Sequence, residues 1–156
     1  METHTPKYDA TARLLHWISA AVILWATLTG FSTLLLANDS ALKHVIADFN
    51  VSLTTLFIPV FLCRVIYRLR TPSPSYNNQL STKEAGIAKV AHCVMYILVT
   101  LVLLSGVLMM TKDIELFHLI AIPQMVHNDF ALALLKKLHT LATVLLGIGI
   151  ILHLAA

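Results

Sequence analysis

The chain has 156 residues, of which 58% are hydrophobic and only 12% are charged, and its formal net charge is +3. A soluble domain carries about 25% charged residues, so this composition excludes a soluble globular protein and indicates an integral membrane bundle. The basic residues lie at the ends of the apolar segments, where membrane topology explains them. The small positive charge therefore does not indicate a nucleic-acid partner.

The first half of the chain predicts two membrane spans. The first apolar run, at about residues 14–36, is long enough to cross about 30 Å of hydrocarbon. It is too long for the apolar part of a secretory signal peptide, so we expect a retained span. His16 and Trp17 open it, and Trp17 fits an aromatic anchor at the membrane interface. After a short outer turn with a helix start signal at residues 38–40, a second span covers about residues 45–67.

The second half predicts two further spans separated by a long connection. After a proline-bearing loop at residues 71–78, the third span covers about residues 88–110 and the fourth about residues 137–156. The apolar runs between residues 111 and 135 are too brief for a fifth span, so we expect a short interfacial helix there. The predicted fold class is all-α, with residues 1–156 forming a single transmembrane four-helix bundle.

The distribution of lysine and arginine predicts the orientation of this bundle. The segment between the second and third spans is the most basic part of the chain, with Arg64, Arg68, Arg70, Lys83 and Lys89. The first outer turn has only Lys43, and the third connection mixes its lysines with acids. Because positive loops stay on the cytoplasmic side, both termini are predicted to be cytoplasmic, and we expect the chain in a bacterial inner membrane.

Two histidines of the last span point to a function. Between His139 and His153 every residue is apolar or small, apart from two threonines. On a helix these imidazoles lie roughly 21 Å apart along the axis and on nearly the same face. Histidine inside hydrocarbon is costly and needs a partner. We favour haem iron as that partner, because neutral imidazole ligates it well.

The predicted topology places three histidines near the inner face of the membrane. These are His16, His92 and His153, on three different spans, and cofactor sites in bundles use side chains from facing helices. A bis-histidine haem site needs two of them. His92 could instead hydrogen-bond a carbonyl or a haem propionate, so its role stays open. We predict His16 and His153 as iron ligands.

The outer face has one strong candidate, His139, which we also predict to bind iron. His44, His118 and His127 are its candidate partners, although each also fits an ordinary interfacial or surface role. A proton relay would use similar residues. It would usually add a carboxylate deep in the membrane, whereas Asp48, the only acid inside a span, lies near the outer edge. This weakens a transporter interpretation.

Taken together, these motifs resemble the bacterial cytochrome b561 family over almost the whole chain. The resemblance is carried by four segments in the family's order: residues 13–17 (Arg-Leu-Leu-His-Trp), 64–74, 91–96 with 105–110, and 137–153. It implies a four-helix membrane bundle with two b-type haems, each held by two histidines. It also implies that His16 pairs with His153. The family includes a superoxide:ubiquinone oxidoreductase, which is the enzyme activity that the resemblance suggests.

The sequence departs from the family at the second haem. The resemblance implies that His139 pairs with a histidine early in the second helix, at a position that Asn50 occupies here. His44 lies six residues earlier, about 9 Å along the axis and about a third of a turn round. It could replace the missing ligand only if the helix start is distorted. The outer haem is therefore expected to be five-coordinate, differently ligated or absent.

The expected function is electron transfer through haem b, from a periplasmic-side donor to membrane ubiquinone. Two axial histidines suit outer-sphere electron transfer rather than oxygen binding. If superoxide is the donor, Lys136 and Lys137 could attract it, although both could merely anchor the helix. One alternative is the haem-bearing membrane anchor of a larger dehydrogenase or hydrogenase, with a soluble redox partner protein. Another is a haem-free transporter or scaffold.

Overall fold

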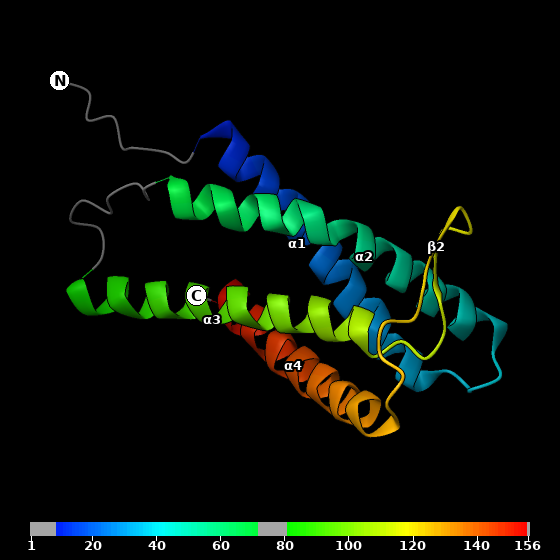
Figure 1. The fold of residues 1–156 in the computed structure, drawn as a ribbon. Coiled ribbons are helices and arrows are strands. Elements are labelled where there is room, and N and C mark those ends of the chain that lie inside the picture. Colours follow the sequence, from blue (N-terminus) through cyan, green and yellow to red (C-terminus); the bar gives the residue numbers. More distant parts are fainter. Residues whose placement is uncertain (1–8, 72–80, 156) are drawn as a thin grey trace.

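The computed structural model describes residues 9–71 and 81–155, and this part of the chain contains four long helices (Figure 1). They are α1 (Ala10–Ser32), which continues into the 3-10 turn η1 (Thr33–Leu35), α2 (Ala41–Arg70), α3 (Thr82–Leu108) and α4 (Asp129–Ala155). All four are long and apolar enough to cross a membrane. The protein is an integral membrane four-helix bundle, as predicted. The predicted loop at residues 71–78 falls almost entirely outside the described residues.

Short polar side chains set where the helices begin. The Asp9 carboxylate accepts a hydrogen bond from the Ala12 backbone N–H at 2.7 Å and caps α1. Ser81 and Glu84 form a reciprocal capping box that starts α3. Such caps satisfy backbone donors that the first helical turn leaves free. α3 therefore begins at Thr82, before the predicted start of the third span at about residue 88.

The connection between α3 and α4 is a β-hairpin, so the interfacial helix predicted there is wrong. Strand β1 (Ile114–Leu116) pairs antiparallel with β2 (Ile120–Ile122). The turn between them places Phe117 and His118 at φ values of 47° and 60°. Alternating side chains bury Ile114 and Leu116, which is the period-two pattern of a strand with one covered face. This hairpin is too short to read reliably from periodicity alone.

A serine of α2 fixes the hairpin to the bundle. The Ser52 side chain is 2% exposed. Its hydroxyl donates to the Glu115 carbonyl at 3.1 Å and accepts from the Phe117 N–H at 3.2 Å. With the hairpin occupying the start of the connection, α4 begins at Asp129, earlier than the predicted fourth span at residue 137.

The helices pack as two consecutive pairs, α1 with α2 and α3 with α4. A buried apolar cluster joins the pairs, and it comprises Phe57, Phe61, Val99, Leu103 and Leu146. Figure 1 shows that the start of α1 and the end of α4 lie at the same end of the bundle, with the hairpin at the other end. We call these the basic end, which carries Arg13 and Arg64, and the hairpin end. The cytoplasmic location of the basic end remains a prediction.

Candidate functional site

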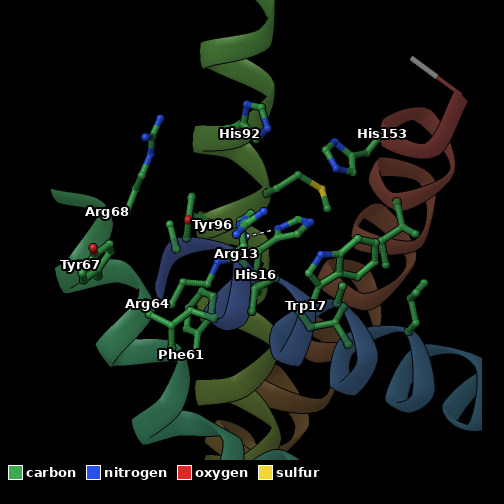
Figure 2. Close-up of a pocket in the computed structure, with 18 of the residues that line it drawn as sticks. Arg13, His16, Trp17, Phe61, Arg64, Tyr67, Arg68, His92, Tyr96 and His153 are labelled. Carbon is green, nitrogen blue, oxygen red and sulfur yellow. Dashed lines mark hydrogen bonds between the residues drawn. The ribbon is translucent and has the colours of Figure 1, made fainter. Parts of the chain in front are cut away.

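A cavity of about 480 Å³ opens at the basic end of the bundle (Figure 2). Residues of all four helices line it, and most of them are apolar. Ligand and cofactor pockets in proteins commonly fall within about 300–1,000 Å³ and combine apolar walls with a few polar groups. Three of these polar groups are the imidazoles of His16, His92 and His153. The structure thus brings together the three histidines that the predicted topology placed at one membrane face.

His16, on α1, contacts an arginine of α2. The Arg64 Nη2 atom lies 3.0 Å from the His16 Nδ1 atom, and the Arg64 guanidinium carbon lies 5.3 Å from the centre of the Tyr96 ring. Because a guanidinium can only donate, Nδ1 accepts and Nε2 carries the ring proton. Iron ligation through Nε2 requires the other tautomer, in which Arg64 turns to a different acceptor.

The imidazoles of His92, on α3, and His153, on α4, lie close together where these two helices line the cavity. Their ring centres are 5.6 Å apart and the rings are nearly perpendicular, at 75°. His92 Nδ1 lies 2.7 Å from the Ala88 carbonyl oxygen and donates to it, which is one of the two roles left open for this residue. A Cβ at Gly149 would lie only 2.7 Å from the Met95 sulfur. Glycine at this position therefore permits the close approach of α3 and α4.

This set of residues fits a haem. Apolar walls, several imidazoles and three cationic side chains, Arg13, Arg64 and Arg68, line one cavity, and haem combines an apolar macrocycle, an iron and two carboxylates. Within residues 9–71 and 81–155, no three His, Cys, Asp or Glu side chains gather so as to hold a metal ion by themselves. A group that brings its own four equatorial ligands suits these imidazoles better than a bare ion does.

His139 lies at the hairpin end, apart from this cavity. Its Nδ1 atom is 3.1 Å from the Val102 carbonyl oxygen and 3.1 Å from the Ser105 hydroxyl. A Cβ at Gly106 would lie 3.2 Å from the His139 Cε1 atom, so the ring packs closely on α3. Donation from Nδ1 to a carbonyl fixes the tautomer with a free Nε2 lone pair, as in many ligating histidines.

The proposed partners of His139 do not form a second imidazole cluster in the structure. The Asn50 Oδ1 atom instead accepts a hydrogen bond from the Thr29 hydroxyl at 2.9 Å. His44 is exposed in the first turn of α2, and His127 is exposed before α4. His118 is exposed in the hairpin turn and lies 2.9 Å from the Glu115 carboxylate.

A membrane four-helix bundle with imidazoles of three helices around one apolar cavity is the architecture of a haem-carrying membrane protein. Residues 7–156 match the sequence model of a family described as prokaryotic cytochrome b561. The chain is also 26% identical to cytochrome b561 homolog 2 of Escherichia coli strain K12 over 112 residues. That alignment covers 71% of this chain and 60% of the relative, so the chain spans less than two thirds of the relative's length.

The chain therefore belongs to the prokaryotic cytochrome b561 family. It is a multi-pass bacterial membrane protein, and the family implies haem b and electron transfer. The family was predicted from motifs in the sequence. The contact of Arg64 with His16 and Tyr96 was not, because a basic residue at the end of a span is already explained by topology.

Proposed function

We propose that the chain passes electrons through one haem b at the basic end, with His16 and His153 as its axial ligands. The convergence of imidazoles from different helices on one largely apolar cavity is the observation that supports this proposal. The proposal takes residues 1–156 as a single transmembrane cytochrome b domain in the bacterial inner membrane. When bound, haem supplies a one-electron redox centre whose potential depends on its ligands and burial.

The surrounding side chains have separate roles in this proposal. His92, held by the Ala88 carbonyl, lies beside His153 and limits how its ring can turn. Arg64 and Arg13 supply positive charge toward the carboxylates of the cofactor. The apolar wall lowers the local dielectric, which strengthens these charge interactions.

Membrane ubiquinone is the proposed electron acceptor. If His16 and His153 hold the iron, no open coordination position would be left for a substrate, and electron exchange would be outer-sphere with a partner that approaches the cavity. A lipid-soluble quinone can reach a site inside a membrane bundle. Its reduction to the quinol takes two electrons and two protons, and a haem bound in this cavity would supply the electrons singly.

Superoxide is the first donor to test, because the family resemblance suggests it. Each superoxide would lose one electron and leave as dioxygen. Lys136 and Lys137 are exposed at the hairpin end, beside His139, where their charge would attract an anion. If superoxide delivers its electron at the hairpin end, a Lys136→Gln, Lys137→Gln variant should slow superoxide-driven haem reduction at low salt, followed by stopped-flow absorbance; if it delivers the electron at the basic end, the rate should be unchanged. An unchanged rate would rule out this role for the two lysines.

A haem-bearing membrane anchor for a soluble redox subunit is the second candidate function. The position of the cavity favours this anchor function, because a soluble partner that binds at the basic end of the bundle would lie next to the cavity. Co-purification of a redox subunit from native membranes would support it. Superoxide-dependent quinone reduction by the isolated chain would count against it. Family membership argues against the haem-free transporter or scaffold.

The proposed function is tested first by the spectrum of the purified full chain, expressed with haem supplied. We expect the split bands of a low-spin b-type haem on reduction, and their reoxidation by a soluble ubiquinone analogue. A reduced spectrum that shows a five-coordinate, high-spin haem would contradict bis-histidine ligation at the basic end. Absence of haem would overturn the proposal.

A further inference from the structure

The two ends of the bundle differ in a way that bears on how many haems the chain can hold. We infer that this protein carries a single haem b, at the basic end, and that side-chain contacts within the protein take the place of a second haem at the hairpin end. The inference rests on the proposed function and goes beyond it by excluding a second haem at the hairpin end and naming the contacts that take its place.

The first observation concerns Asn50, which stands where the resemblance implies a ligand. Its Oδ1 atom is already bonded to the Thr29 hydroxyl, 2.9 Å away across the α1–α2 contact. An amide oxygen is a neutral, hard ligand of the kind that suits magnesium, calcium or manganese rather than haem iron. Asn50 therefore ties α1 to α2 and offers no second axial ligand.

The second observation concerns His44, the other candidate on α2. It is exposed in the first turn of the helix, and α2 is regular from Ala41 through Asn50. The helix start is thus not distorted, and six residues of regular helix keep His44 about 9 Å along the axis from Asn50. His44 does not take over the missing position.

The third observation is where the cavity stops. Its lining on α4 comprises Ile150, His153 and Leu154 and does not extend back to His139. Leu146, midway between the two histidines, is 3% exposed and belongs to the buried apolar cluster. This cluster separates the cavity from the level of His139, where the imidazole packs on Gly106 and α3.

A single haem at one end restricts the route of the electrons. His139 lies roughly 21 Å from His153 along the α4 axis. If the hairpin end holds no haem, no redox centre bridges this distance. Donor and quinone must then both exchange electrons at the basic end. This arrangement favours a donor that approaches the basic end over superoxide at the hairpin end.

The test is the number of haems per chain. The amount of haem is measured by pyridine haemochrome and is divided by the amount of protein in the same sample of the purified full chain. We expect one haem in the wild-type protein and two in Asn50→His, in which an imidazole replaces the amide at the position that the family resemblance pairs with His139. Asn50→Ala is the matched control and should keep one haem, because it removes the Thr29 contact without adding a ligand. Adding His139→Ala to Asn50→His should return the content to one.

Several results would overturn the inference. Two haems in the wild-type protein would contradict it directly. An Asn50→His variant that keeps one haem and a wild-type thermal midpoint would show that Asn50 is not what prevents a second haem. A redox titration gives an independent readout, with one potential step expected for wild type and two for Asn50→His. A wild-type protein without any haem would instead refute the proposed function.

Discussion

The basic end and the hairpin end of the bundle both carry histidines, yet their surroundings differ. At the basic end, imidazoles of three helices border a cavity of about 480 Å³. At the hairpin end, His139 packs on α3, while Asn50 and Thr29 bond to each other. Two histidines fourteen residues apart on the same face of α4 therefore have very different environments.

The difference shows that the spacing of histidines on one helix does not define a site. A site also requires side chains from facing helices and space between them. At the basic end α1 contributes a second imidazole, that of His16, and α3 contributes a third, that of His92. At the hairpin end His139 contacts α3, and Asn50 of α2 is already bonded to Thr29 of α1, so the same spacing leads to contacts within the protein.

Replacing His153 should have the largest effect on this comparison. We predict that His153→Ala lowers the haem content more than tenfold, because one axial ligand is lost, whereas changes in outer-shell partners cost about 10–100-fold in metal affinity. His139→Ala is the matched control on the same helix and should retain the haem. If His153→Ala keeps the full b-type spectrum, the ligands are His16 and His92 instead. Equal loss in both variants would remove the distinction between the two ends.

A smaller effect is expected at the hairpin, where Ser52 bonds two backbone groups. Ser52→Ala removes the hydroxyl that bonds the Glu115 carbonyl and the Phe117 N–H in a part-buried contact, and the net loss of two such hydrogen bonds costs about 1–3 kcal/mol. We predict faster hydrogen exchange at residues 114–122 and no change in haem content. Ser40→Ala is the control, since the Ser40 side chain makes no capping hydrogen bond. Loss of haem in Ser52→Ala would show that the two ends are coupled.

The smallest effect is expected for Asp9, at the basic end. The Tyr67 hydroxyl donates to the Asp9 carboxylate, and this hydrogen bond, with that from the Ala12 N–H, lowers the pKa of Asp9 below its ordinary value. Because the folded-state pKa is lowered, the contact stabilises the protein above the ordinary aspartate pKa of about 3.9. That stabilisation is lost as the pH falls through the lowered pKa.

This pH dependence can be measured as the difference in thermal midpoint between wild type and Asp9→Asn in detergent. The difference should be constant near neutral pH and shrink only at strongly acidic pH. Asp129→Asn, which removes a carboxylate at the hairpin end, controls for the change in net charge. A difference that is the same at every pH would show that the Asp9 charge does not stabilise the contact between α1 and α2.

The sequence predicted the parts of the fold that depend on local signals. The length of each apolar run predicted the four helices, and the polar residues at 38–40 correctly placed the start of α2. The hairpin was missed because its strands have three residues each and their anchor, Ser52, is 63 residues from Glu115 in the chain. No local pattern reveals such a contact.

The site was predictable to a similar extent. Topology alone grouped His16, His92 and His153, because consecutive spans alternate in direction and return these residues to one end. The position of Arg64 beside His16 depends on how α1 and α2 are aligned with each other, a relation that neither helix encodes by itself. The packing of His139 on Gly106 depends in the same way on the contact of α3 with α4.

The pairing of consecutive helices also has a consequence for assembly. Contacts between α1 and α2, and between α3 and α4, join neighbours in the chain, and such local contacts form sooner than distant ones. Each helix pair can therefore enter the lipid and pack before the other pair is complete. The space between the two helix pairs takes its final shape only when Phe57 and Phe61 of α2 pack against Val99, Leu103 and Leu146. A cofactor bound in the proposed site would thus need both helix pairs to be in place.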